Sequence, residues 1–275
     1  MKIEYTKRPT NEISIDDCWF YHVQDIPGLS KPTEGIWDLR KGVDEYLGKV
    51  DFKNKTVLEL GPSSGYLTFH MEKLGGNITS IDLDINAQNW DIVRRVKSDW
   101  RKELKDFTRN ESSKARNAFW YAHKANNSNS KLIECHVNDL PNDIGFYDIS
   151  TICAVLLHLQ NPFLAMEKML SHTKEKIIIT ETGGYTRVKS YRNIIRNIFR
   201  RFRQNPPPTM TFLPVQNRRP FMWWKLSPEI IVSIANILGF EKSTVTYHKQ
   251  IVNKKPVPMF TVVCERTVPI KDCNY

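Results

Sequence analysis

The strongest constraint on the fold is a glycine-bearing turn that follows an apolar strand. Residues 56–60 have the sequence Thr-Val-Leu-Glu-Leu, a short apolar run typical of a buried strand. The turn Glu59-Leu-Gly-Pro-Ser-Ser-Gly65 comes next, and a helical stretch extends to about Leu74. A second strand, residues 78–81, then ends on Asp82. A strand, a turn, a helix and a strand in this order predict a βαβ unit.

The rest of the chain continues to alternate between strands and helices. In chain order, we expect a third strand over Leu132–Val137, a fourth over Tyr147–Val155, a helix from about Pro162 to Leu170, a fifth strand over Lys176–Thr180, and a helix with Ser227 as N-cap, Pro228 as first residue and Gly239 at its end. Strands that alternate with helices predict an α/β fold with a doubly wound, mostly parallel sheet.

The C-terminal region has a different pattern. Two β-rich runs, Ser243–Val252 and Met259–Glu265, flank the turn-like residues Asn253–Pro258. We expect a closing hairpin that adds an antiparallel strand to the sheet.

The glycine turn also predicts a ligand, because glycines let the backbone approach one without an intervening Cβ. A dinucleotide fingerprint would need glycine at positions 63 and 66, where the chain has Ser63 and Tyr66, so nicotinamide dinucleotides are disfavoured. Asp82 lies 21 residues after Gly61 (82 minus 61), close to the separation of about 20 at which an acidic residue reaches ribose hydroxyls. A glycine turn in an unrelated α/β protein is the alternative for the motif alone.

The spacing E-x-G-x-x-x-G resembles motif I of class I S-adenosylmethionine-dependent methyltransferases. This resemblance implies a Rossmann-like seven-stranded fold, with an antiparallel last strand and S-adenosylmethionine as cofactor. It implies that Glu59 lies near the amino end of the methionine moiety and that Gly61, Ser63 and Gly65 face the cofactor. Ser63 stands where many family members have glycine.

Two further segments resemble elements of the same superfamily. Asn138-Asp139-Leu140-Pro141 is similar to its N/D-D-L element, which implies that Asp139 accepts from the adenine amine and that Leu140 donates to the ring. An Asp turn before a proline is the alternative. Residues 147–162 resemble motif IV, and Glu181 after the fifth strand fits the element that follows.

The N-terminal region, with Trp19-Phe-Tyr-His22 and Gly35-Ile-Trp37-Asp-Leu-Arg40, is similar to the region before motif I in the tRNA uridine-5-oxyacetic acid methyltransferase family. That family has Tyr-His-Arg-Arg after the fourth strand, whereas this chain has Leu157-His-Leu-Gln160. The Arg and Tyr that recognise a carboxylated cofactor are therefore missing, which favours ordinary S-adenosylmethionine. A histidine followed by Asn-Pro instead resembles methyltransferases found beside glycan biosynthesis enzymes.

Methyl transfer to a hydroxyl needs a base that removes its proton. His158 is our first candidate, because it follows the fourth strand at the edge where ligands bind in open α/β sheets. A histidine that caps the next turn is the alternative. Glu181 and Tyr185 are further catalytic candidates. No set of His, Asp and Glu has spacing that suits a metal, so we expect a metal-free mechanism.

Candidate contacts for the acceptor come from two aromatic regions. We expect substrate contacts from His22, Trp37, Arg40, Trp223 and Trp224. Residues 1–50 are expected to form an N-terminal extension over the active site, and residues 51–275 a methyltransferase domain with insertions at about 90–130 and 185–225.

The 275-residue chain carries a formal net charge of +10, which favours a polyanionic partner. Segment 187–203 is basic, with apolar residues at helical spacing, and could contact nucleic acid, a membrane surface or the substrate pocket. The chain lacks a long apolar stretch and has five scattered cysteines, so we expect a soluble cytoplasmic protein without a transmembrane segment.

Three functional hypotheses follow. The first is O-methylation of a sugar, a glycan or another small metabolite. The second is methylation of tRNA or another RNA, and the third is a non-catalytic cofactor-binding or interaction module.

Overall fold

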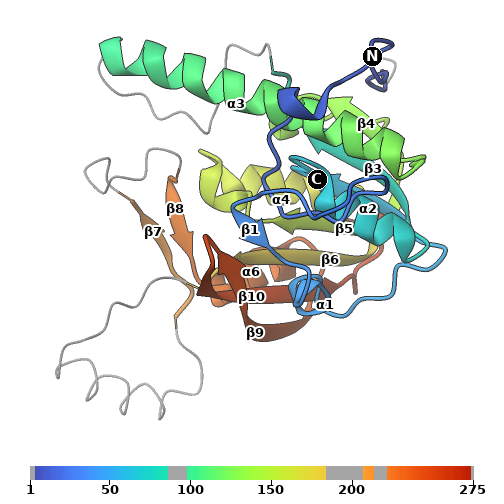
Figure 1. The fold of residues 1–275 in the computed structure, drawn as a ribbon. Helices are drawn as coiled ribbons and strands as arrows, with labels where there is room; N and C mark the ends of the chain where they lie inside the picture. Colours follow the sequence, from blue (N-terminus) through green and yellow to red (C-terminus); the bar gives the residue numbers. More distant parts are fainter. Residues whose placement is uncertain (1–3, 86–97, 184–206, 214–221, 274–275) are drawn as a thin grey trace.

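The computed structural model describes residues 4–85, 98–183, 207–213 and 222–273. One sheet of eight strands forms its centre, in the order β1-β9-β10-β6-β5-β2-β3-β4 (Figure 1). The strands are β1 (Trp37–Asp38), β2 (Thr56–Leu60), β3 (Asn77–Asp82), β4 (Lys131–Glu134), β5 (Tyr147–Cys153), β6 (Thr173–Thr182), β9 (Lys242–Val252) and β10 (Lys255–Glu265). Strands β2 to β6 pair in parallel, and β10 pairs antiparallel with both β6 and β9.

This topology confirms the predicted Rossmann-like fold with an antiparallel strand near one edge. The sheet has eight strands rather than seven, because the two-residue strand β1 pairs with the end of β9, with Trp37 opposite Val252. The added strand comes from the N-terminal segment, which covers part of an otherwise exposed sheet edge.

Helices cover both faces of the sheet. The α-helices are α1 (Val43–Tyr46), α2 (Tyr66–Lys73), α3 (Ser98–Ala125), α4 (Pro162–Ser171) and α6 (Pro228–Ile237), with short 3-10 helices η1 (Ile15–Asp17), η2 (Val137–Asp139), η3 (Leu156–His158) and η4 (Ile270–Asp272). Buried residues of α4 and α6 pack against one face, and those of α1 and α2 against the other.

Alternating side chains on the central strands make this three-layer arrangement possible. In β6, Ile177 and Ile179 lie in the core with α4 and α6, whereas Ile178 lies in the core with α1 and α2. A strand with a period of two that is buried on both faces has an almost continuous apolar sequence. The run Ile177-Ile-Ile179 therefore serves two cores at once.

Helix α3 runs beside the N-terminal segment and β4 (Figure 1). Its second half forms a third core, in which Phe119 and Trp120 are buried with Phe69 of α2 and Leu132 of β4. Backbone bonds tie the N-terminal segment to this edge, since Trp19 N donates to Lys114 O at 3.1 Å. The insertion after β3 is thus packed against the domain through its C-terminal half.

Several predicted boundaries differ from the structure, and the ends of two strands show why. The third predicted strand ends at Glu134 instead of Val137, because residues 137–139 turn into η2, whose first turn is capped by His136. The fourth ends at Cys153 instead of Val155, because Ala154 adopts a left-handed φ of 56°. Strands cannot continue through a residue in that region.

The turn predicted over residues 253–258 is only two residues long. Asn253 and Lys254 have φ of 47° and 62°, as a two-residue hairpin turn requires, and β10 begins at Lys255. Pro256 and Pro258 therefore lie inside the strand. Because hydrogen-bonded pairs alternate along an antiparallel ladder, both prolines occupy positions whose nitrogen faces away from β9.

The C-terminal helix begins as predicted, with Ser227 as N-cap and Pro228 in the first turn, and Gly239 follows its end with φ of 84°. A separate two-stranded sheet, β7 (Met210–Phe212) and β8 (Trp224–Leu226), precedes this helix.

No helix in the described ranges has both the length and the apolar character needed to cross a membrane.

Candidate functional site

A cavity of about 630 Å³ opens at the carboxyl ends of β2, β3, β4 and β5. From β2 the chain continues to β3 and β4 on one side, whereas β5 and β6 lie on the other side of β2. This is the topological switch point, where open α/β sheets bind ligands. The cavity is lined by Trp19, Tyr21, His22, Ile36, Trp37, Tyr46, Leu60, Gly61, Pro62, Ser63, Leu67, Ile81, Asp82, Leu83, Ile85, Glu111, Ser112, Ala115, Arg116, Cys135, His136, Val137, Cys153, Ala154, Val155, His158 and Leu159.

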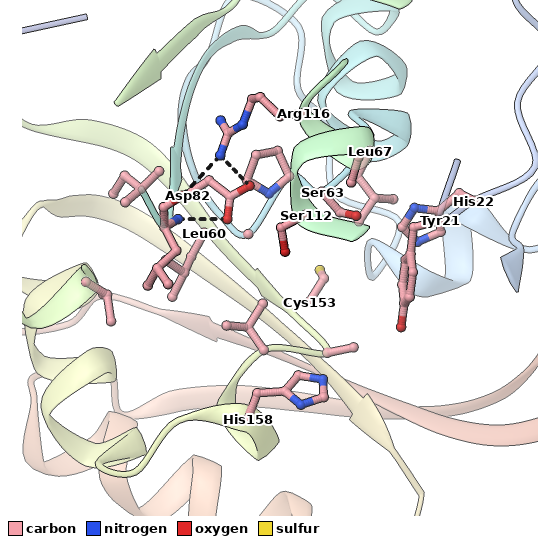
Figure 2. A pocket seen from close by; sticks show the side chains of 18 of the residues that line it. Tyr21, His22, Leu60, Ser63, Leu67, Asp82, Ser112, Arg116, Cys153 and His158 are labelled. Carbon is pink, nitrogen blue, oxygen red and sulfur yellow. Dashed lines mark hydrogen bonds and ion pairs between the residues drawn. The ribbon is translucent and has the colours of Figure 1, made fainter. Parts of the chain in front are cut away.

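Two ends of the cavity can be distinguished (Figure 2). At one end, which we call the Asp82 end, Asp82 and Arg116 form an ion pair, and Gly61 lies nearby because its N–H donates to Ile81 O at 2.8 Å. At the other, which we call the aromatic end, lie Tyr21 and His22, and the nearby Trp37 belongs to the same wall.

The loop between β2 and α2 forms part of the wall through a repeated left-handed backbone. Gly61, Ser63 and Gly65 have φ of 76°, 51° and 84°. A Cβ on Gly61 would lie 2.7 Å from Cγ2 of Val155, and one on Gly65 would collide with the ring of Phe69. The first and last positions therefore require glycine for both conformation and space, while Ser63 carries the strain of a non-glycine residue in this region.

Glu59 lies beneath this loop and does not line the cavity. Thr68 Oγ1 and Ser80 Oγ donate to its Oε2 at 2.5 and 2.7 Å, while Oε1 is buried without a hydrogen-bond partner. Burial raises the pKa of the Glu59 carboxyl to about 7, and the two hydroxyl donors oppose this rise. Glu59 thus connects β2, α2 and β3 from within, and its predicted contact with a cofactor stays a prediction.

Asp82 lines the cavity at the end of β3, and both of its carboxylate oxygens have partners. Leu83 N donates to Oδ1 at 2.9 Å, and Nη2 of Arg116 lies 3.1 Å from Oδ2. Burial raises the pKa of the Asp82 carboxyl, whereas the Arg116 charge and the Leu83 N–H lower it. The sequence did not point to Arg116, because it lies in the middle of a charged helix with no motif around it.

The residues after β4 differ from the predicted arrangement. Asp139 is exposed and Leu140 is buried in the core with α4 and α6, and neither lines the cavity. His136 and Val137 line it instead. The segment turns into η2 immediately after the strand, so its first residues face the cavity and the later ones face outward or into the core. The adenine contacts expected of Asp139 and Leu140 stay predictions.

The aromatic end is joined to the glycine loop through Ser64. The Tyr21 N–H donates to Ser64 Oγ at 3.1 Å, and Gln24 Nε2 donates to Ser64 O at 2.8 Å. Ser64 is fully buried. The loop that approaches the cavity from β2 therefore also anchors the N-terminal segment over it.

Aromatic contacts order the residues of this end. Trp37 Nε1 donates to the Tyr21 hydroxyl at 3.0 Å, and the rings of Tyr21 and His22 meet edge to face with centroids 5.0 Å apart. Burial lowers the pKa of His22 to about 3, so its imidazole is neutral near pH 7, and its Nδ1 is buried without a hydrogen-bond partner. His22 and Trp37 thus line the cavity, and their predicted contacts with an acceptor stay predictions.

The catalytic candidates His158 and Glu181 differ in their access to the cavity. His158, at the end of η3, lines the cavity and its ring faces the space between the two ends (Figure 2). Glu181 of β6 is buried behind the lining, where its Oε1 accepts from Leu157 N at 3.3 Å and its Oε2 has no hydrogen-bond partner. Burial raises the pKa of the Glu181 carboxyl to about 8, and backbone N–H donors partly oppose this.

No protein-family model and no curated protein matches this chain. Solved structures with a similar arrangement include a SAM-dependent methyltransferase from Aquifex aeolicus, with 14% identity, a TM-score of 0.48, and coverage of 84% of this chain and 91% of that chain. Magnesium protoporphyrin IX methyltransferase from Synechocystis PCC 6803 with bound SAH has 12% identity, a TM-score of 0.48, and coverage of 82% and 81%. The N-terminal domain of EvdMO1 with bound SAH has 13% identity, a TM-score of 0.43, and coverage of 82% and 79%. Similarity at this level does not extend to function, which has to come from the residues of the cavity.

Three predicted acceptor contacts lie outside the lining. Arg40 is ion-paired with Asp25 and Asp38 at 3.1 and 2.9 Å. Trp223 N donates to Leu157 O at 2.8 Å, and Trp224 Nε1 donates to Leu159 O at 3.0 Å.

The two tryptophans therefore contact η3, which carries His158, and the residue that follows it.

Tyr185 and the basic segment 187–203 lie outside the described residues. Within the described residues, no group of His, Cys, Asp and Glu is arranged to hold a metal ion.

Proposed function

We propose that the protein is an S-adenosylmethionine-dependent methyltransferase that acts on a hydroxyl group of a sugar or another small metabolite. The observation that carries this proposal is the meeting of Gly61, Ser63 and Asp82 in one cavity at the switch point of the sheet. A left-handed loop and a strand-end carboxylate at this position suit a nucleoside ligand.

The residues present fit an adenosyl cofactor in three respects. Gly61 lines the cavity, and a Cβ there would lie 2.7 Å from Cγ2 of Val155, so this part of the wall has no room for a side chain. The Asp82 carboxylate can accept from two ribose hydroxyls, since each of its oxygens has more than one acceptor site. A cavity of about 630 Å³ lies within the range of cofactor sites.

Bound S-adenosylmethionine supplies an electrophilic methyl group on a sulfonium centre. We assign His158 to the removal of the proton from the acceptor hydroxyl, because it lines the cavity and a neutral imidazole can accept a proton near pH 7. Tyr21 and Trp37 pack against the acceptor and keep water from it. Glu181, behind the lining, supports the backbone of η3 through Leu157 N and so helps to position His158.

The aromatic end favours an uncharged acceptor. Its described residues in the lining are Trp19, Tyr21, His22, Ile36, Trp37 and Tyr46, of which none carries a fixed charge. Aromatic faces pack well against the apolar face of a sugar ring, and the tryptophan and tyrosine polar atoms can orient a hydroxyl. This composition supports a small neutral metabolite over a polyanion inside the cavity itself.

RNA methylation is the second candidate, favoured by the net charge of +10. The segment that contributes most to this prediction, 187–203, lies outside the described residues. Among the described lining residues, the only arginine is Arg116, and its charge is already shared by two carboxylates.

An acceptor screen tests the proposed function. The purified protein is incubated with S-adenosylmethionine and separate pools of neutral sugars, nucleotide-linked sugars, phenols and unmodified tRNA, and release of S-adenosylhomocysteine is measured. We expect release with a hydroxylated small molecule and loss of release in His158→Ala. Methylation of tRNA alone would favour the second candidate, and binding without turnover on any pool would favour a non-catalytic module.

A further inference from the structure

Two carboxylates and one guanidinium meet where β3 and β4 end. Asp82 and Glu134 are direct register partners on these neighbouring parallel strands. Arg116 of α3 approaches both with the same nitrogen, Nη2, at 3.1 Å from Asp82 Oδ2 and 3.3 Å from Glu134 Oε1. The Arg116 side chain is only 8% exposed. One buried cation therefore serves two carboxylates that would otherwise face each other alone.

We propose that Arg116 is a positioning residue for the nucleoside ligand: it offsets the repulsion between Asp82 and Glu134 and holds the Asp82 carboxylate ready for the ribose hydroxyls. This inference rests on the proposed function, because it concerns how the same cavity recognises its cofactor. It assigns a binding role to α3, an element that carries no recognisable cofactor motif.

A hydrogen bond and an ion pair together hold the Asp82 carboxylate. Leu83 N fixes Oδ1, and Arg116 Nη2 fixes Oδ2 while also donating to Leu83 O at 3.2 Å. Arg116 thus restrains both the side chain of Asp82 and the backbone just after it. Since each carboxylate oxygen has two acceptor sites, both oxygens keep one for a hydroxyl donor.

The placement of Arg116 is rigid because the helix around it is packed. Ala115, Ala118 and Phe119 are buried in or beside the third core, and Lys114 O accepts from Trp19 N. Glu134 is held as well, since Thr6 Oγ1 donates to its Oε2 at 3.3 Å. The ends of β3 and β4 and the helix α3 are all held by packing. The repulsion between Asp82 and Glu134 therefore has to be offset by the Arg116 charge rather than by movement of the carboxylates.

Burial of the Asp82 carboxyl makes the nearby Arg116 charge important for ligand binding. It raises the pKa of the Asp82 carboxyl, and the charge of Arg116 is the largest opposing influence. A protonated carboxyl would present a donor to a ribose hydroxyl in place of an acceptor. Arg116 therefore favours the form of Asp82 that accepts from both hydroxyls.

A double-mutant cycle tests the proposal by calorimetric titration with S-adenosylhomocysteine at pH 7. The variants are Arg116→Gln, Glu134→Gln and the double variant, with Arg116→Lys as a charge-conserving variant and Lys174→Gln as a charge-matched control on an ion pair with Asp148. Thermal unfolding establishes that each variant is folded.

We expect Arg116→Gln to weaken binding by about tenfold or more, and Glu134→Gln to change it by less than about threefold. The double variant should bind at least about fivefold more tightly than Arg116→Gln, because the repulsion on Asp82 is gone. Lys174→Gln should bind within about threefold of the wild type. Arg116→Lys should bind more tightly than Arg116→Gln, because it keeps the positive charge, and less tightly than the wild type, because it lacks the guanidinium geometry.

A double variant that binds no better than Arg116→Gln would overturn the proposal, since a mere packing role is not rescued by removing Glu134. If Arg116→Gln does not fold, a loss of more than about tenfold in Glu134→Gln would overturn it on its own, and unchanged binding in that variant would support it. Failure of the proposed function is a different outcome, in which the wild-type protein itself does not bind S-adenosylhomocysteine.

Discussion

The two ends of the cavity arise from the chain in different ways. The Asp82 end is built by consecutive strand-end loops, in which Gly61 and Asp82 are separated by one βαβ unit. The aromatic end is assembled from Tyr21, His22 and Trp37, which precede the first parallel strand and reach the cavity only through contacts such as that of Tyr21 N with Ser64. A local pattern of turns and spacing encodes Gly61 and Asp82, whereas Arg116 and the whole aromatic end reach the cavity through tertiary packing.

The largest expected effect is on kcat, in a variant of His158 that should leave cofactor binding unchanged. His158→Ala should lower kcat by about 100-fold or more on the acceptor found in the screen, because general-base catalysis typically contributes this much. Its affinity for S-adenosylhomocysteine, measured by calorimetry, should stay within about twofold, because His158 lies apart from Asp82. An unchanged kcat, or a loss of cofactor binding equal to the loss of rate, would contradict the division between the two functions.

A pH experiment addresses the buried carboxyl behind the cavity. Because burial raises the pKa of Glu181 from 4.5 to about 8, the native state binds a proton more tightly than the unfolded chain, and this contribution to stability is lost as pH rises through that interval. Glu181→Gln keeps a carbonyl oxygen for Leu157 N, so the variant should be more stable than the wild type at pH 8.5 by roughly 2 kcal/mol, with little difference near pH 4.5.

Chemical denaturation at both pH values measures this difference. Glu175→Gln is the matched control, since that carboxylate is half exposed and pairs with Lys55 at 2.7 Å. Equal stability of Glu181→Gln and the wild type at pH 8.5 would show that Glu181 is not held in an environment that disfavours its charge.

The Asp82 end can be tested through the glycine loop. Gly61→Ala combines a φ of 76° with a Cβ only 2.7 Å from Val155, so we expect it to lower the free energy of unfolding by about 2 kcal/mol and to weaken cofactor binding. Gly145→Ala is a matched control, because Gly145 has φ of 84° but nothing within 4 Å of the new Cβ. It should lose only about 1 kcal/mol. Equal losses in the two variants would mean that the close approach to Val155 is unimportant.

The smallest expected effect concerns the middle of the same loop. Ser63 has φ of 51°, so Ser63→Gly should raise the free energy of unfolding or leave it within about 1 kcal/mol of the wild type, as relief of strain offsets the added entropy of the unfolded chain. Ser64→Gly should be clearly destabilising, because Ser64 Oγ accepts from Tyr21 N. Thermal unfolding of the pair compares them, and a larger loss at Ser63 than at Ser64 would contradict this reading of the loop.

The sequence predicts the sheet well because apolar strand periodicity and glycine turns are local signals. Strand β2 has the predicted bounds, and β3 differs from prediction by one residue at its start. The hairpin turn is shorter than expected, since Pro256 and Pro258 resemble turn residues but occupy strand positions that need no N–H. The local residue pattern thus predicts where a strand lies, whereas its exact ends depend on how it pairs with neighbouring strands.

The site is only partly predictable for a related reason. Asp82 and His158 follow strands and so reach the switch-point edge by topology alone, which spacing can reveal. Arg116 reaches the same edge from the middle of a 28-residue helix, and its role depends on helix packing that no spacing rule describes. Asp139 belongs to a motif that resembles an adenine contact, but the 3-10 helix η2 exposes its side chain outside the lining, so the contact stays a prediction.

Calorimetric titration of the wild-type protein and Asp82→Ala with S-adenosylmethionine, S-adenosylhomocysteine and NAD is the most direct test of the central claim. We predict micromolar binding of the first two ligands, no measurable binding of NAD, and loss of binding in Asp82→Ala while the variant stays folded. Absence of binding by the wild type, or binding that Asp82→Ala leaves unchanged, would contradict the assignment of this cavity to an adenosyl cofactor.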